Sequence, residues 1–153
     1  GFIKYLIPFY TSIDEGKTAF YITEFVHDVE EGNYEDFFIR LQSLFADTPY
    51  ELIRDLELHY QNVLFIVSKL LGFYVQAEYH TSDGRIDLTV QTDKYIYVME
   101  FKFDGSAEEA LQQIEEKRYI LPFAKDNRKI VKAGVNFSSK TRNIEKWLVK
   151  EVE

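Results

Sequence analysis

The hydrophobic pattern of this 153-residue chain changes its period at Gly72. From Leu52 to Leu71 apolar residues recur every three or four positions, as on one face of a helix. From Phe73 onward apolar and polar residues alternate, which is the period of a strand. Helices with one apolar face and strands with one apolar face bury those faces against each other. The pattern therefore predicts an α/β domain in which a helical part precedes a sheet.

Several helices are predicted before Gly72. Residues 17–29 and 34–45 have helical spacing, and a further helix is expected after Thr48, because Thr48-Pro49-Tyr50-Glu51 has the spacing of a capping box with Pro at the first helical position. Ser12-x-x-Glu15 has the same spacing and predicts an earlier helix start. Gly72 is the expected end of the third helix.

Three strands in succession are predicted next. Residues 74–81 and 85–92 alternate, and Ser82-Asp83-Gly84 between them is a strong turn signal. Residues 95–103 are almost all apolar, which is typical of a central strand buried on both faces.

A helix and one or two strands complete the prediction. Ser106-x-x-Glu109 predicts the start of a helix that runs to about Tyr119, and Pro122 ends it. Residues 129–137 read as a further strand. Residues 143–152 fit a strand or a helix, and their alternation favours a strand.

Hairpin register places charged residues of two strands on one face. If Asp83-Gly84 and Asp93-Lys94 are two-residue turns, Asp87 lies directly opposite Glu100, with Cβ atoms about 5 Å apart. Alternation puts Lys102 on the same face as Glu100, and Arg85 on the same face as Asp87. An odd-length turn at Asp93-Lys94 would shift the register by one residue and separate the two acids.

Charges on a buried strand need partners, and a divalent cation is one candidate. Asp87 and Glu100 offer oxygen ligands to Mg²⁺ or Mn²⁺, with the backbone carbonyl of Phe101 as a further ligand. Such an ion activates a water for attack on a phosphodiester, and Lys102 would orient that water or stabilise the developing charge. An ion pair of Lys102 with Asp87 or Glu100, without metal, explains the same residues equally well.

Composition limits the partners. The net charge of −8 argues against nucleic acid, but residues 124–150 carry eight basic and two acidic side chains, a net of +6. This segment is either a substrate-facing side or an ordinary solvated sheet edge, and residues 125–132 are a candidate for backbone contacts. The chain has no Cys, which suits a reducing cytoplasm, and no apolar run long enough for a membrane span.

The motifs together resemble a known family. Gly84-Arg85-Ile86-Asp87, Glu100-Phe101-Lys102 and Ala110-Leu111-Gln112-Gln113-Ile114 are similar to motifs of the PD-(D/E)XK nuclease superfamily. More closely, the chain is similar to the nuclease-like domain that lies C-terminal to a predicted AAA-type ATPase domain in many bacterial proteins. The similarity extends to Gly134-Val135-Asn136-Phe137-Ser138 and the segment from Arg142 to Trp147, and covers nearly the whole chain.

The resemblance implies a restriction-endonuclease-like αβββαβ core and Mg²⁺-dependent (or Mn²⁺-dependent) phosphodiester hydrolysis. Asp87 matches the Asp of the "PD" motif, and Glu100 and Lys102 match the acid and the Lys of "(D/E)XK". Glu57 matches an acidic position that some members add to the metal site, and Gln113 a Gln near the active site in related families. Two positions depart from the pattern. Ile86 replaces the nominal Pro, and Tyr119 is six residues after Gln113 rather than four, which argues against a site role for Tyr119.

The resemblance also implies the surroundings of the domain. Residues 1–47 are expected to be a helical lobe that connects to an N-terminal ATPase-like domain, and residues 48–153 the nuclease-like core. The expected partner is nucleic acid, DNA rather than RNA. Two alternatives stay open: a catalytically inactive module that mediates interactions within an ATPase-containing protein, and hydrolysis of another phosphodiester.

Overall fold

A computed structural model describes residues 15–47, 53–117 and 119–153, with side-chain detail from residue 21 onward. Its elements, in chain order, are α2 (Glu15–Glu31), α3 (Tyr34–Ala46), α4 (Leu56–Leu71), β1 (Gln76–Ser82), β2 (Arg85–Gln91), β3 (Tyr95–Phe103), α5 (Ala107–Glu116), the short 3₁₀ helix η3 (Leu121–Phe123), β4 (Lys129–Ser138) and β5 (Asn143–Glu151). The order of helices and strands is the predicted one, and the last segment is a strand.

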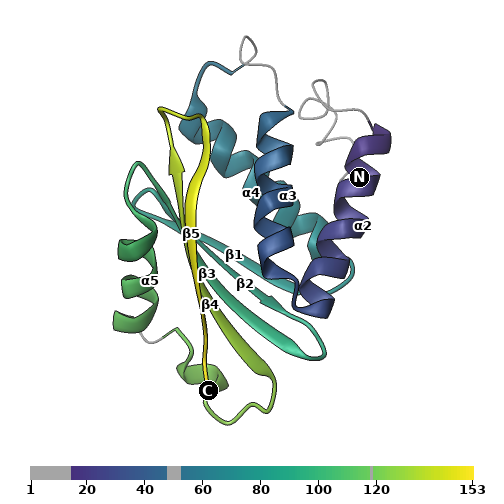
Figure 1. Cartoon of the computed structure of the whole chain (residues 1–153), viewed down its shortest axis with the longest axis vertical. Helices are drawn as coiled ribbons and strands as arrows, with labels where there is room; N and C mark the ends of the chain where they lie inside the picture. The colour runs from purple at the N-terminus through teal and green to yellow at the C-terminus, as the bar shows by residue number, and fades with distance from the viewer. Residues whose placement is uncertain (1–14, 48–52, 118) are drawn as a thin grey trace.

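The five strands form one mixed sheet in the order β1-β2-β3-β4-β5 (Figure 1). The first three are an antiparallel meander, β3 and β4 are parallel, and β5 returns antiparallel to β4. Two parallel neighbours need a crossover connection, and α5 with η3 supplies it. The predicted α/β fold with a restriction-endonuclease-like core is confirmed.

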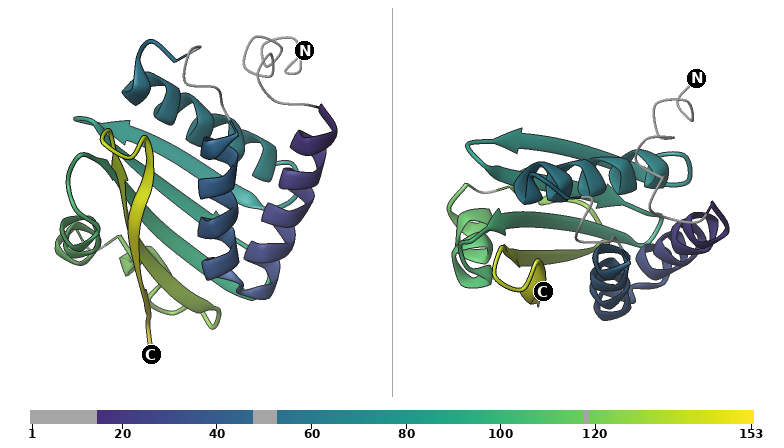
Figure 2. Two further views of the ribbon diagram at one scale, coloured as in Figure 1. Left: turned by 45° about the horizontal axis from the view of Figure 1, so that its top comes forward. Right: turned by 90° about the horizontal axis from the view of Figure 1, so that it is seen from above.

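Helices cover the two faces of the sheet unequally. α2, α3 and α4 pack against one face of the sheet, and α5 packs against the opposite face (Figures 1 and 2). The larger core joins residues of α2–α4, such as Phe25, Phe38 and Leu64, to sheet residues such as Leu88 and Met99. The N-terminal helices therefore share one hydrophobic core with the sheet. The boundary between residues 47 and 48 stays a prediction.

A smaller cluster lies under α5. It contains Ile96 and Val98 of β3, Ile114 of α5 and Ile130 of β4. Gly134 of β4 lets this helix approach closely, since a Cβ at that position would lie 2.4 Å from the carbonyl oxygen of Ala107. Because side chains on β3 alternate, Glu100 and Lys102 project from the α5 face as well.

Two predicted helix boundaries were wrong. The helix expected after Thr48 begins at Leu56, because the carboxylate of Asp55 caps it by accepting a hydrogen bond from the Leu58 amide at 3.0 Å. Ile53 and Arg54 precede it in non-helical conformation. The proposed caps at Thr48 and Ser12 lie outside the described residues.

The second wrong boundary concerns α5. It ends at Glu116 rather than near Tyr119, and the chain then turns toward η3. No helix within the described ranges has the length and apolar character needed to cross a membrane.

Candidate functional site

The predicted register of the meander is confirmed. Asp87 lies opposite Glu100, and His80 lies opposite Asp87 on the other side. Asp83 and Gly84 both adopt positive φ (51° and 78°), as a tight two-residue hairpin turn requires. At the other hairpin, the Thr92 amide donates to the Tyr95 carbonyl at 2.8 Å, which closes the two-residue turn. These turns bring the two acids together on the α5 face.

Glu100 is completely buried, and neither of its carboxylate oxygens has a hydrogen-bond partner among the described residues. Burial raises the pKa of the Glu100 carboxyl to about 7, the nearby Asp87 carboxyl adds to the rise, and the charges of Arg85 and Lys102 oppose it. A buried carboxyl in this state is costly, and polar groups left unsatisfied in this way concentrate at functional sites.

The neighbouring polar atoms are also incompletely satisfied. Asp87 Oδ1 is buried without a hydrogen-bond partner, as is Oε1 of Gln113, which α5 supplies. Arg85 Nε lies 3.8 Å from Asp87 Oδ2 and 3.7 Å from Glu100 Oε1, beyond ordinary hydrogen-bond length. The site therefore contains four buried acceptor oxygens, counting both of Glu100, for which the described protein supplies no donor.

Tyr119 reaches this group although its spacing from Gln113 argued against a site role. Its hydroxyl donates to Asp87 Oδ2 across a long 3.4 Å hydrogen bond. Contact becomes possible because α5 ends at Glu116 and the following turn brings Tyr119 back toward the sheet. Sequence spacing assumed a continuous helix and missed this contact.

The other predicted site residues are placed as follows. Lys102 is half-buried, and its stem lies so close to Gly105 that a Cβ there would be 3.1 Å from Lys102 Cδ. The Phe101 side chain is fully buried in the larger core, so only its backbone is available to the site. Glu57, in the first turn of α4, lies beside the β1–β2 turn, where a Cβ on Gly84 would be 3.7 Å from Glu57 Oε1.

The donor set suits a hard divalent cation. Mg²⁺ and Mn²⁺ prefer carboxylate, carbonyl and amide oxygens, and Mg²⁺ keeps several waters rather than filling its shell with protein ligands. Asp87 and Glu100 supply carboxylates, and Gln113 supplies an unpaired amide oxygen. The described residues contain no group of three or more acidic or His side chains arranged around one metal position. The residues therefore fit an ion held by two carboxylates and completed by water.

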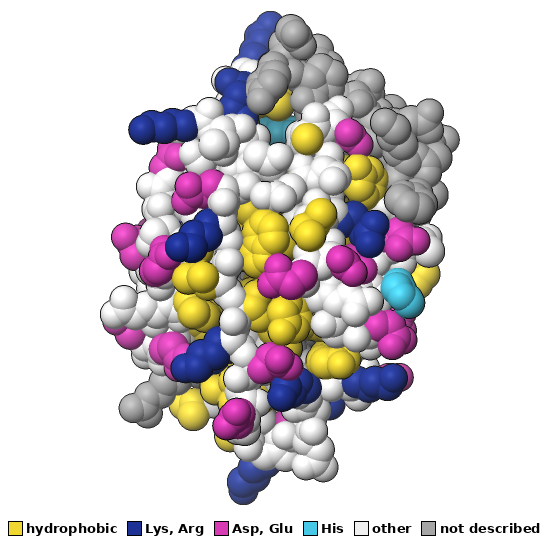
Figure 3. All heavy atoms as spheres, in the orientation of Figure 1, with side chains coloured by type: hydrophobic (Ala, Val, Ile, Leu, Met, Phe, Trp, Pro, Cys, Tyr) yellow, Lys and Arg dark blue, Asp and Glu magenta, His cyan; other side chains and the backbone are white. Residues whose placement is uncertain are grey.

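The basic segment is largely neutralised by the protein itself. Lys132 and Lys150 pair with Glu115, and Lys146 pairs with Glu108. Arg128 and Lys129 pair with Asp126 and Glu151. Figure 3 shows Lys and Arg beside Asp and Glu over the face in view, rather than one patch of positive charge. This arrangement favours the solvated sheet edge over a broad phosphate-binding surface.

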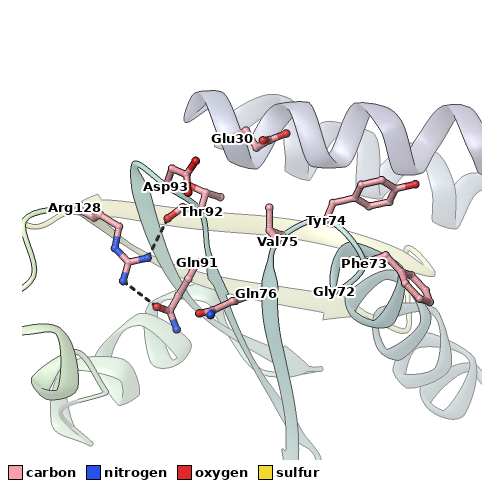
Figure 4. Close-up of a pocket in the computed structure, with 10 residues that line it drawn as sticks. All are labelled: Glu30, Gly72, Phe73, Tyr74, Val75, Gln76, Gln91, Thr92, Asp93 and Arg128. Atoms are coloured by element: carbon pink, nitrogen blue, oxygen red, sulfur yellow. Dashed lines mark hydrogen bonds between the residues drawn. The ribbon is translucent and has the colours of Figure 1, made fainter.

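A pocket at the far end of the β2–β3 hairpin lacks comparable unsatisfied groups. It lies between the end of α4, the start of β1 and the β2–β3 turn, with Arg128 at one side (Figure 4). The Arg128 guanidinium donates to Thr92 O at 3.0 Å, to Gln91 Oε1 at 2.9 Å and to Asp126. Because these hydrogen bonds use the donors of Arg128 to fix the β2–β3 turn, the acceptor-rich group around Glu100 is the stronger candidate site.

Comparison with known proteins shows the family of the chain. The sequence model of the PD-(D/E)XK nuclease superfamily matches residues 55–147, which include Asp87, Glu100 and Lys102. A protein of Azotobacter chroococcum mcd 1, named "Uncharacterized protein in vnfD 5'region", is 32% identical over 117 residues, or 72% of this chain. The matched stretch spans only 23% of that relative's length. No solved structure matches the chain. On its sequence and its fold, the chain belongs to the PD-(D/E)XK nuclease superfamily.

Proposed function

We propose that this domain is a nuclease that hydrolyses phosphodiester bonds of DNA with Mg²⁺ or Mn²⁺. The observation that carries the proposal is Glu100, a buried carboxyl with two unpaired oxygens, opposite Asp87 in a chain of this superfamily. A carboxylate with a structural role, in contrast, has its hydrogen-bond donors: Asp104 accepts hydrogen bonds from the amide and hydroxyl of Ser139 at 2.8 and 2.7 Å. An acceptor cluster left without donors is suited to binding a cation.

Each residue has a distinct role in the proposal. Asp87 and Glu100 hold the cation, and the Phe101 carbonyl is a further ligand. When bound, such an ion lowers the pKa of a water and offsets negative charge developing on the phosphate. Lys102, beside Glu100 on the same strand face, orients the attacking water or stabilises that charge. Gln113 supplies an amide oxygen from α5, and Glu57 is a further acidic ligand from the first turn of α4, beside the β1–β2 turn.

A non-catalytic role has support from one observation. Ion pairs with acidic side chains of the domain neutralise most of the basic side chains of residues 124–150, and the whole chain has a net charge of −8. An acidic surface of this kind repels a polyanion. The alternative proposal is a nuclease-fold module that mediates interactions within a protein that also contains an ATPase-like domain. RNA and other phosphodiesters are the alternative substrates of the enzymatic proposal.

The context of the domain is proposed from resemblance. We place an ATPase-like domain N-terminal to residue 1 of the same polypeptide, and the protein in the bacterial cytoplasm. The curated relative is about four times longer than the stretch it shares with this chain, which leaves room there for further domains.

A cleavage assay separates the proposals. Wild-type protein is incubated with single-stranded DNA, double-stranded DNA and RNA in Mn²⁺, beside Asp87→Ala, Lys102→Ala and Lys94→Gln, an exposed lysine at the far turn. We expect cleavage of DNA by the wild type and by Lys94→Gln, and losses of about a hundredfold or more in the two site variants. Cleavage that survives both site substitutions would rule out this mechanism. No cleavage of any substrate by the wild type would favour the interaction module.

A further inference from the structure

The Arg85 guanidinium lies between the two carboxylates of the proposed site but bonds to neither. Its Nε is 3.8 Å from Asp87 Oδ2 and 3.7 Å from Glu100 Oε1, whereas N–H···O hydrogen bonds measure about 2.7–3.2 Å. That nitrogen is buried and has no hydrogen-bond partner in the described protein. Arg85 therefore compensates the charge of the pair without the directional bonds that would fix it there.

Two other arginines in this chain, Arg40 and Arg128, make much tighter ion pairs. Arg40 Nε donates to Asp28 Oδ2 at 3.0 Å. Arg128 donates to both oxygens of Asp126, at 2.9 and 2.7 Å. Such fork-shaped pairs are the usual geometry of a structural arginine and carboxylate. The loose placement of Arg85 is therefore a local feature of the site and not a general property of this fold.

Space for movement lies directly beside Arg85. On the α5 face, the helix makes its main contacts with β3, β4 and β5. The side chains of β1 on that face are exposed: Gln76, Glu78, His80 and Ser82. Ser82 is the neighbour of Arg85 across the strands. The guanidinium can swing outward over β1 without displacing any packed side chain of that strand.

We infer that Arg85 is an exchangeable counter-ion. It offsets part of the negative charge of Asp87 and Glu100 in the metal-free protein, gives way when a divalent cation binds them, and then contacts the phosphodiester from the open side over β1. This inference rests on the proposed function. A divalent cation held by Asp87 and Glu100 would repel a guanidinium that lies 3.7–3.8 Å from the same oxygens, and no hydrogen bond to them holds Arg85 Nε in place against that repulsion. A guanidinium presents paired donors that match two phosphate oxygens, which makes the displaced group useful for substrate binding.

Calorimetric titration with Mn²⁺ tests the competition directly. Arg85→Gln removes the competing charge, Arg85→Lys keeps it, and Lys94→Gln makes the same charge change at the exposed far turn of the β2–β3 hairpin. We expect Arg85→Gln to bind Mn²⁺ about tenfold more tightly than the wild type, and the other two variants to stay within about twofold of it. Cleavage by Arg85→Gln should nevertheless fall, so metal affinity and turnover change in opposite directions.

The outcomes distinguish this inference from the proposal beneath it. Equal Mn²⁺ affinity in the wild type and Arg85→Gln, or weaker affinity in the variant, overturns the role of Arg85 and leaves the metal site standing. Absence of Mn²⁺ binding in both proteins overturns the metal site and this inference together. Tighter binding in Lys94→Gln as well would show a general effect of net charge, which also overturns it.

A second measurement uses the unaltered protein and does not depend on whether a variant folds. Phenylglyoxal modifies accessible arginines, and peptide mass spectrometry follows each site. Mn²⁺ should speed the modification of Arg85 several-fold and leave Arg128, held by four hydrogen bonds from its guanidinium, unchanged. A short DNA strand with Ca²⁺ in place of Mn²⁺ should then protect Arg85. Slower or unchanged modification of Arg85 in Mn²⁺ would overturn the exchange.

Discussion

An arginine lies beside carboxylates at each end of the β2–β3 hairpin: Arg128 at the far end, where the turn is, and Arg85 at the near end, where β2 begins. The two clusters differ in how the arginine is bonded. At the far end Arg128 holds Asp126 at 2.7 Å and also donates to Thr92 O and Gln91 Oε1. At the near end Arg85 stays 3.7 Å or more from both Asp87 and Glu100. The first, the far cluster, is half-buried and fully bonded. The second, the near cluster of Arg85, Asp87 and Glu100, contains the completely buried Glu100 and carries the unsatisfied atoms.

The contrast separates stability from function within one hairpin. The Arg128 cluster shows that the chain can satisfy an arginine and an acid where the purpose is to fix a loop. Leaving Glu100 buried without donors lowers stability, and a group of this kind persists in a protein when an activity depends on it.

Glu100→Gln should give the largest effect. The amide keeps the shape of the side chain but removes the charge that the proposed cation needs, which corresponds to several kcal/mol of transition-state stabilisation. Each 1.36 kcal/mol is a factor of ten in rate, so we expect DNA cleavage in Mn²⁺ to fall about a thousandfold or more. The matched change at the other cluster, Asp126→Asn, should leave the cleavage rate within about threefold of the wild type. Similar losses in both variants would abolish the distinction between the clusters.

The strand register at the site could be predicted from sequence because it depends on local chemistry. Asp83-Gly84 and Asp93-Lys94 fix two short turns, and the period of two then determines that Asp87 faces Glu100. The strand boundaries were likewise predicted to within two residues. The start of α4 was not, because Thr48-Pro49-Tyr50-Glu51 predicted an earlier start and only the fold shows that Asp55 forms the cap.

Contacts that depend on tertiary packing could not be predicted. Tyr119 reaches Asp87 only because α5 ends early and the chain folds back. The alternation of β2 put Arg85 on the correct face, but no pattern indicated that it would lie between two carboxylates without bonding to them. The charge of the basic segment was read correctly from sequence, yet its neutralisation by Glu108 and Glu115 of α5 required the packed structure.

Gly134→Ala should give the next largest effect, by moving α5 away from the near cluster. The added Cβ would lie 2.4 Å from the Ala107 carbonyl oxygen and 2.5 Å from the Leu111 amide nitrogen, and backbone atoms cannot yield as a flexible side chain can. We expect a loss of about 2–3 kcal/mol in the free energy of unfolding, measured in urea. Cleavage should fall as well, since α5 carries Gln113. Arg128 lies outside this helix, so its phenylglyoxal reactivity should not change, and a change there would show that the damage is global.

Glu100→Gln should also stabilise the metal-free protein, in contrast to its effect on activity. Folding raises the pKa of Glu100 from 4.5 to about 7. Below pH 4.5 the carboxyl is protonated in both states; above it the unfolded chain gains by ionising, so stability is lost up to about pH 7 and stays lost above. In EDTA the variant should therefore exceed the wild-type Tm by roughly 3–6 °C at pH 8 and by little at pH 4.5. A lower Tm at pH 8 would show that the charged carboxylate is part of the structural framework.

Tyr119→Phe should give a smaller change at the near cluster. The hydroxyl makes one long hydrogen bond of 3.4 Å to Asp87, and the ring packs against the cluster under α5. Removal of the hydroxyl keeps the ring and frees Asp87 Oδ2, so we expect cleavage to fall by about threefold to tenfold with little change in Tm. Tyr34→Phe removes a comparable long bond, 3.3 Å to Glu151, away from the site and serves as the control. Equal effects of the two changes would remove Tyr119 from the site.

Asp126→Asn should have the smallest effect, and an effect of opposite sign to that of Glu100→Gln in the metal-free protein. Hydrogen bonds from Arg128 lower the pKa of Asp126 from 3.8 to about 2. This stabilisation is therefore present above pH 3.8 and is lost as the pH falls toward 2. The variant should melt about a degree or two below the wild type at pH 7, because an ion pair near the surface contributes little, and the difference should shrink as the pH falls below 4. Thermal unfolding from pH 3 to pH 8 of both variants beside the wild type then measures the two clusters on one scale. If the Tm differences of both variants from the wild type change in the same direction with pH, both carboxylates are structural. If the two differences diverge with rising pH, Asp126 stabilises the fold and Glu100 does not.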